Sequence, residues 1–209
     1  MHTMRILAAA AFVTAIAVTS VSAQQPQPQR VRGVIEKVDG NTLLIKSAPS
    51  GAQVTLKLAD NAVIVGVLKA TVADIKEGSY IGSGALPQPD GTQKAVEVHI
   101  FAESQRGTGD GHRGNWDGTA YGAGFGTMTN GAAGQAVSSV DGPVITVKYK
   151  DGEKKIVVGP SVPIVRYEVG DKSELKPGAA ISVAAATKNP DDTFSAARVN
   201  VGRNGVVPM

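Results

Sequence analysis

The sequence contains no cysteine, and this excludes several kinds of site at once. Without thiols the chain can form no disulfide, no thiolate metal centre and no cysteine nucleophile. Aromatic residues are also scarce, at 4% of the 209 residues. Surfaces that bind nucleic acid combine clustered basic residues with aromatic ones, whereas charges of both signs alternate along this chain without a basic run. We therefore expect no nucleic-acid partner.

Only one long apolar run is present, at residues 6–18. It follows Arg5 and precedes small residues at 21–23, which is the pattern of a secretory signal peptide with its cleavage site. The run is shorter than the roughly 20 residues that span a bilayer, although an uncleaved membrane anchor is the alternative. We expect residues 1–23 to be removed, leaving a periplasmic or secreted chain that does not span the membrane.

The rest of the chain divides into repeated and unrepeated segments. Residues 24–30 are rich in Pro and Gln and lack apolar residues, which predicts a disordered leader. Three pairs of stretches then match in the same order along the chain, namely 31–47 with 132–149, 73–81 with 173–181, and 95–101 with 196–202. This pattern indicates a duplication. It predicts a first repeat at 31–101, a second repeat at 132–203 and a C-terminal tail at 204–209.

Alternating apolar and polar residues predict the same order of elements in each repeat. In the first repeat they indicate strands at 31–38, 42–47, 53–58, 79–86 and 94–101, of which the third can continue to 65. Between the third and fourth strands, Thr71 and Asp74 can cap a single helical turn. This is the element order of an OB-fold. We predict an all-β protein with two tandem five-stranded OB-like barrels, each with one short helical turn, joined by a long Gly-rich loop. A β-sandwich that shares one core between the repeats is the alternative.

The Gly-rich loop at 102–131 holds the candidate site. It contains the only Trp and one of three His among nine Gly, and long loops of this kind are functional, structural or disordered. Gly109, Gly111 and Gly114 match a dinucleotide-binding pattern, but no helix is predicted to follow them. The candidate ligand-binding or loop-anchoring residues are Arg106, Asp110, His112, Arg113, Trp116 and Asp117. Outside the loop, His99 is expected to be a solvated residue on the polar face of its strand.

These residues favour binding over catalysis. The sequence predicts an exported, non-catalytic binding or interaction module without a cofactor, whose partner is a small ligand, a metal ion or an envelope protein. The alternative is a periplasmic divalent-metal-binding protein that uses His112 with Asp110 or Asp117, although their spacing matches neither an EF-hand nor a zinc signature. A hydrolase using Ser104, His112 and Asp117 lacks the sequence context of a nucleophile elbow.

Several motifs resemble a known family. The stretches VDGNTLLIKS, DIKEG and AVEVHIF resemble an exported bacterial family of duplicated OB-like β-barrel modules with a domain of unknown function. The loop motifs RGTG, GHR, WD and TMTNG are similar to a subgroup often labelled metal ABC transporter permease, but Gly114-Asn115 stands where a Pro beside Trp116 is expected. The resemblance implies an exported OB-like protein. It does not imply transport, because a permease needs several membrane spans.

Overall fold

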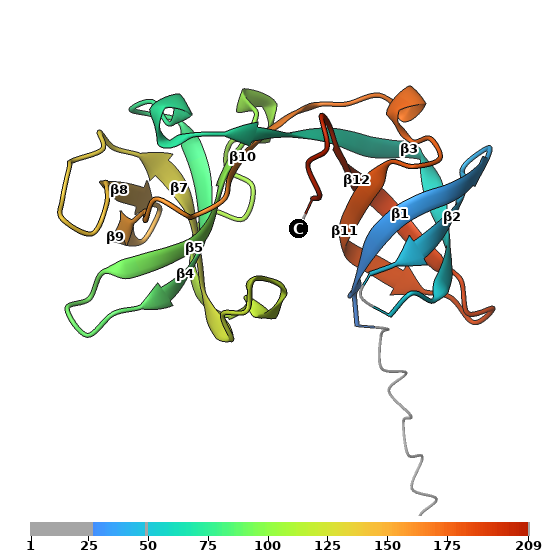
Figure 1. Ribbon diagram of the computed structural model, residues 1–209, viewed down its shortest axis with the longest axis horizontal. Helices are drawn as coiled ribbons and strands as arrows, with labels where there is room; N and C mark the ends of the chain where they lie inside the picture. Colours follow the sequence, from blue (N-terminus) through green and yellow to red (C-terminus); the bar gives the residue numbers. More distant parts are fainter. Residues whose placement is uncertain (1–26, 49, 209) are drawn as a thin grey trace, which may run out of the picture.

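A computed structural model describes residues 27–48 and 50–208, which form a protein built almost wholly of strands (Figure 1). The predicted signal peptide lies outside the described residues. The first strand already begins at Gln29, two residues inside the predicted disordered leader. The all-β class is confirmed, and the described residues include no helix long and apolar enough to cross a membrane.

The strands follow the period-2 patterns of the sequence. The first half forms β1 (Gln29–Asp39), β2 (Thr42–Ser47), β3 (Gln53–Ala70), β4 (Tyr80–Pro87) and β5 (Gln93–Ile100). The second half forms β6 (Gly111–Asp117), β7 (Phe125–Ala133), β8 (Val144–Tyr149), β9 (Gly152–Val157), β10 (Ile164–Val169), β11 (Ala180–Lys188) and β12 (Phe194–Gly202). Four single turns of 3-10 helix lie between them, η1 (Val72–Asp74), η2 (Glu103–Gln105), η3 (Thr119–Tyr121) and η4 (Lys172–Glu174).

Five strands close into a barrel, here called the first barrel. Its order is β1–β2–β3–β12–β11, with β11 returning to pair with β1. Every pairing is antiparallel except β12–β3, which is parallel. Alternate residues of these strands fill its core, including the fully buried Leu43, Ile45, Leu56 and Val199. The predicted five-stranded barrel is therefore present.

The strands of that barrel come from both halves of the chain, so the predicted tandem arrangement is not confirmed. β1, β2 and β3 of the first half are closed by the β11–β12 hairpin of the second. Conversely, β7, β8 and β9 join the β4–β5 hairpin in a second ring, ordered β4–β5–β9–β8–β7. Its core contains Ile81, Val98, Ile145 and Ile156. Each half thus contributes three strands to one ring and a hairpin to the other.

Equivalent backbone hydrogen bonds form in the two rings, just before the first strand of each exchanged hairpin. In the first barrel, Gly178 N donates to Ile35 O at 2.8 Å and Ile35 N donates to Ala179 O at 2.9 Å. In the second ring, Gly78 N donates to the carbonyl of Ala133 at 2.7 Å, and Ala133 N donates to Ser79 O at 2.8 Å. The turns DIKEG and ELKPG, which align in the sequence, therefore dock in the same way on opposite rings.

Strand β3 connects the rings directly. Its 18 residues can span roughly 60 Å at 3.3 Å per residue. Its first part belongs to the first barrel, and residues 65–70 pair with β10, which in turn pairs with β5 of the second ring. Figure 1 shows β3 running across the top of the molecule, with the C-terminal segment descending between the rings. Pro160 and Pro163 separate β9 from β10, whereas β3 is unbroken.

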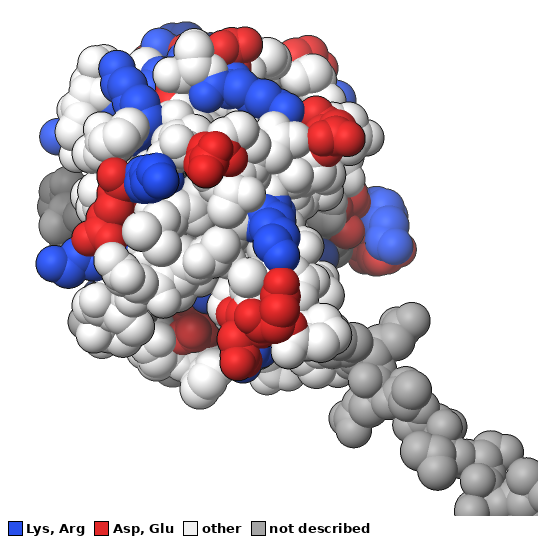
Figure 2. All heavy atoms as spheres, turned by 90° about the vertical axis from the view of Figure 1, so that its right-hand side faces the viewer, with Lys and Arg blue, Asp and Glu red and all other residues white. Residues whose placement is uncertain are grey.

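Charges on the outer side of the first barrel are interspersed. Figure 2 shows basic and acidic side chains next to each other on this face, without a large patch of one sign. Two exposed ion pairs there are Lys57–Asp191 at 2.7 Å and Lys188–Asp192 at 2.8 Å. Exposed pairs of this kind contribute little to stability.

Arg203 anchors the chain at the end of β12. Its guanidinium forms two hydrogen bonds to Glu174, of 2.7 and 2.8 Å, and one of 2.7 Å to Glu168. It also lies over Gly66, where an added Cβ would come within 2.3 Å of it. Hydrogen bonding from Arg203 lowers the pKa of Glu174. This contact joins β10, η4 and β12 through a bidentate pair that is mostly shielded from solvent.

Arg203→Gln is expected to lower the melting temperature by several degrees at neutral pH and to flatten its dependence on acid. A carboxyl group whose folded pKa is depressed stabilises the protein above its unfolded pKa, about 4.3 for Glu, and this contribution is lost as pH falls through the folded pKa. Circular-dichroism melts from neutral pH into acid measure it. Arg166→Gln, which removes an exposed pair to Glu168, is the control. An unchanged acid profile in Arg203→Gln would contradict the assignment.

Candidate functional site

A cavity of about 710 Å³ lies between β5, β10, the 158–163 segment and the C-terminal segment. Its wall contains apolar side chains from distant parts of the sequence, including Val72, Val162, Pro163 and Val206. The cavity is here called the central cavity. Because its lining comes from both halves of the chain, it exists only where the rings are joined.

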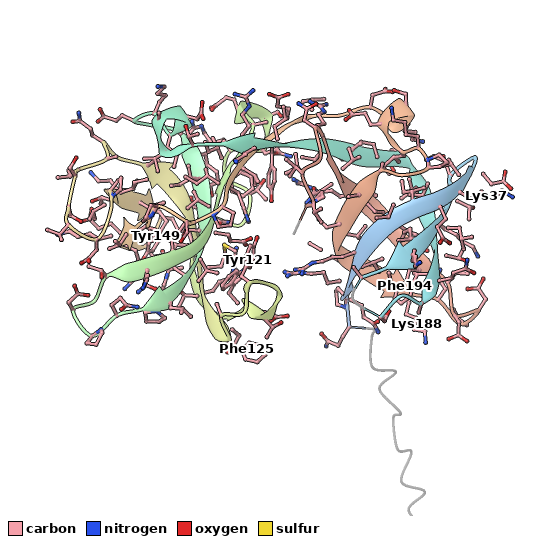
Figure 3. The ribbon with its side chains drawn as sticks, viewed as in Figure 1. Lys37, Tyr121, Phe125, Tyr149, Lys188 and Phe194 are labelled. Carbon is pink, nitrogen blue, oxygen red and sulfur yellow. The ribbon has the colours of Figure 1, made fainter. Side chains whose placement is uncertain are left out.

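A buried carboxylate and its partners form the polar part of the central cavity. Glu97 of β5 is 5% exposed, and its Oε1 lies 3.0 Å from His99 Nε2. The hydroxyl of Tyr121, from η3, donates to the other carboxylate oxygen. All three residues line the cavity. Figure 3 shows Tyr121 on the side of the second ring that faces the first barrel.

His99 is packed rather than solvated, so its predicted exposure is wrong. Its side chain is 13% exposed, and its ring stacks on that of Tyr167 with centroids 5.3 Å apart. Phe101 contacts both rings edge-on, at 6.4 and 5.5 Å. The alternation along β5 does place His99 outside the core of its ring, but there the side chain of Tyr167, from the neighbouring strand β10, covers it.

Tyr167 separates this cluster from the first barrel. Its side chain packs with Val65 and Val67 in a small core of its own. Burial first, and then the negative charge of Glu97, raise the pKa of its hydroxyl above the ordinary value. Tyr167 therefore remains a neutral phenol at physiological pH, with a polar end and an aromatic face at the cavity wall.

Trp116 packs beside Tyr121, a member of the Glu97–His99–Tyr121 cluster. It is 7% exposed, and its ring lies 6.1 Å from that of Tyr121. An added Cβ on Gly84 would come within 2.3 Å of the indole, and one on Gly118 within 2.6 Å. Glycines at these two positions therefore let the indole lie flat against the backbone of β4 and the η3 turn. Trp116 therefore contacts the residue that bonds to Glu97, which is the position the predicted loop anchor requires.

Asp117, the next predicted residue, precedes the η3 turn and bonds to its first residue. Its Oδ1 accepts hydrogen bonds from the backbone N and the hydroxyl of Thr119, at 3.0 and 2.6 Å. The bonds from Thr119 lower the pKa of Asp117, and the positive charges of Arg30 and Arg32 lower it further. Asp117 therefore helps to form the turn that carries Tyr121 and faces charges of the first barrel.

Arg106 and Asp110 lie at a different place, around Tyr80. Asp110 accepts from the Tyr80 hydroxyl at 3.2 Å and from the backbone N of Lys150 at 2.8 Å. Arg106 lies over the Tyr80 ring at 5.8 Å and donates to the carbonyl of Gly78 at 2.9 Å. Burial first, and then Asp110, raise the pKa of Tyr80 to about 12. These contacts hold the 102–110 segment on the second ring.

His112 and Arg113 contact neither the Glu97 cluster nor the residues around Tyr80. His112 Nδ1 lies 2.8 Å from Thr129 Oγ1, and its ring stacks on Tyr149 with centroids 6.3 Å apart. Burial first, and then the charge of Lys154, lower its pKa. Arg113 donates to the carbonyl of Gly109 at 2.9 Å. The six predicted residues are therefore divided among three places, and only Trp116 and Asp117 lie near the central cavity.

The predicted loop is itself largely folded. Residues 102–131 contain η2, β6, η3 and most of β7, so the expectation of a long loop without strands is wrong. β6 pairs with β7 as an added strand of the second ring, with an irregularity between Arg113 and Trp116. This pairing was not predicted from the sequence, because the glycines of β6 break the alternation that indicates strands.

Metal-binding geometry is not found among the described residues. Within 27–48 and 50–208, no group of three or more His, Asp or Glu side chains could hold a metal ion. Asp110 and Asp117 already accept the hydrogen bonds described above. The predicted metal-binding alternative thus gains no support from the arrangement of His112, Asp110, Asp117 and His99.

Comparisons with protein-family models, with curated proteins and with solved structures found no match to this chain. The functional argument therefore depends on the residues of the central cavity.

Proposed function

We propose that this chain is an exported, non-catalytic binding module that takes a small ligand into the central cavity. The observation that carries the proposal is the combination of a cavity of about 710 Å³ with the Glu97–His99–Tyr121 cluster in its wall. Small-molecule sites are mostly apolar concavities of about 300–1,000 Å³ with a few convergent polar groups. The signal-peptide pattern of residues 1–23 supports the periplasmic or secreted location.

The same proposal includes two OB-like barrels formed by exchange of hairpins. Each half has a run of strands, a short 3-10 turn and a hairpin, with β9 and β10 of the second half at the place of the single strand β3. This order supports the interpretation. It also agrees with the resemblance to exported duplicated OB-like modules. OB-folds usually bind through the face of strands 2 and 3, whereas the central cavity lies where β5 and β10 meet between the rings.

The cavity proposal is tested by filling the cavity. Val207 lines the cavity and is 65% exposed, so Val207→Trp adds bulk there without entering a core. Backbone amide spectra recorded with a library of small cations, anions and neutral compounds should show shifts at residues such as Val162, Tyr167 and Val206. For each compound that does so, Val207→Trp is expected to weaken binding about tenfold or more, a loss of about 1.4 kcal/mol.

The matched control is Val140→Trp, at a fully exposed position away from the cavity. It should leave both binding and stability unchanged, since surface substitutions have small effects. If the shifts instead cluster at His112 and Arg113, or if no compound binds, the proposed function is wrong.

A further inference from the structure

The arginines of the described chain separate into two groups. Residues 27–208 contain seven arginines, and four of them, at positions 106, 113, 166 and 203, form hydrogen bonds or ion pairs. The guanidinium groups of Arg30, Arg32 and Arg198 form none with other described residues. The three unpaired arginines share one location, here called the arginine wall.

The strand register fixes that location. Arg30 and Arg32 flank the buried Val31 on β1, so both point outward from the first barrel. Arg198 lies beside the buried Val199 on β12 and likewise points outward. Asn200, two residues after Arg198 and on the same side of β12, pairs with Val65 of β3, and Val65 packs with Tyr167 of β10. Because β10 pairs with β5, this outward side is the one that faces the second ring.

Groups of the second ring lie opposite the arginine wall without touching it. Arg32 is influenced by the charges of Glu97 and Asp117. Among the described residues, no ion pair within 4.0 Å joins an arginine of the wall to Glu97 or Asp117. Glu97 and Arg198 also occupy matching positions of the aligned stretches AVEVHIF and AARVNVG. Matching positions of the two halves therefore carry opposite charges that no ion pair among the described residues joins.

The arginine wall destabilises the folded state when no anion is bound to it. Burial first, and then the neighbouring charge of Arg30, lower the pKa of Arg32, and burial lowers that of Arg198. Arg32 Nε and the nearby Asn200 Oδ1 are buried without hydrogen-bond partners. A partly desolvated cation and an unmade hydrogen bond both destabilise the folded state. A bound anion would pair with the cations and accept from Arg32 Nε, because guanidinium groups bind carboxylate and phosphate oxygens in a fork geometry. Asn200 Oδ1 is itself an acceptor and would need a donor from another part of the ligand.

We infer that the ligand of the central cavity is a small organic anion whose carboxylate or phosphate group is held by Arg30, Arg32 and Arg198. This inference rests on the proposed function. Tyr167 and the apolar cavity wall take the body of the ligand. The three arginines do not line the cavity itself. They lie on the side of the first barrel that packs on Tyr167 through Val65, and they take the anionic group where the ligand extends out of the cavity. Glu97, as a like charge nearby, limits the affinity and orients the anionic group toward the first barrel.

Matched pairs of probes test the inference. Benzoate is compared with benzamide, and benzyl phosphate with benzyl alcohol, while inorganic phosphate shows whether the anionic group suffices alone. The anionic member of at least one pair is expected to bind about tenfold or more tightly, to shift the Nε–Hε signal of Arg32 and to weaken as salt is added. The two pairs distinguish carboxylates from phosphate esters.

Charge-removing variants complete the test. Arg32→Gln and Arg198→Gln should abolish the preference for the anion, whereas Arg113→Gln, with the same loss of charge on β6, should retain it. Glu97→Gln should tighten anion binding several-fold, because a like charge is removed. If both members of each pair bind the cavity equally, the anion inference is wrong while the proposed function stands. If Val207→Trp has no effect on any probe, the proposed function itself is wrong.

Discussion

Cutting the chain after Gly107 is expected to leave a folded complex of two fragments, neither of which folds as a monomer. Of the thirteen strand pairings among residues 27–48 and 50–208, six join the two sides of this cut. The N-terminal fragment alone would lack β11 and β12, which close the first barrel. A sheet left open in this way exposes unpaired edges and half of its core. The expected effect is the loss of all cooperative folding in the isolated fragments.

The experiment begins with the intact protein. A protease site inserted at Gly107, which is exposed and lies in a turn, allows cleavage of the already folded chain. The nicked protein should keep its circular-dichroism spectrum and its size on gel filtration. After separation in denaturant, each fragment alone should be unfolded or self-associated, and mixing should restore a 1:1 complex.

The uncut parent carrying the same inserted site is the control, since it shows what the insertion costs. A folded, monomeric fragment containing only residues before Gly107 would support one barrel per repeat. Such a result would contradict the exchanged hairpins.

Local structure was largely predictable from the sequence, but strand pairing was not. Alternation placed β2 at 42–47 as observed, and the Thr71–Asp74 pair marked the η1 turn. The alternation of apolar and polar residues defines which face of a strand is buried, but it does not determine which strands pair with it. The hairpins β4–β5 and β11–β12 have similar sequences. The alternation pattern therefore does not show which hairpin closes which ring. The length of β3, which continues past 58 to Ala70, is the feature that favours exchange.

The central cavity was not predicted from the sequence for a related reason. The only Trp and the glycines directed attention to residues 106–117, but most of those side chains hold the segment in place. The cavity residues come from β5, η3 and β10, whose proximity depends on the exchange. A signal was nevertheless present, because Glu97 and Arg198 occupy matching places in the aligned stretches. Opposite charges at matching positions of two copies suggest surfaces that face each other.

Trp116→Ala is expected to reduce the stability of the protein by about 3–5 kcal/mol, a large share of a typical total of 5–15 kcal/mol. The indole is buried against Gly84, Gly118 and Tyr121, and its removal leaves a cavity that these backbone segments cannot fill. For a chain of this length the melting temperature should fall by roughly 6–20 °C, at about 2–4 °C per kcal/mol. Circular dichroism is the appropriate measurement, because the variant has no Trp fluorescence.

Phe125→Ala is the matched control. Phe125 pairs with Asp117 across the β6–β7 ladder but is 74% exposed, and Figure 3 shows it at the lower end of the second ring. Its loss should change stability by no more than about 0.5 kcal/mol. Trp116→Ala should also release Tyr121 from Glu97 and weaken probe binding in the central cavity, whereas Phe125→Ala should not. Equal melting temperatures for the two variants would show that Trp116 is not the anchor of this segment.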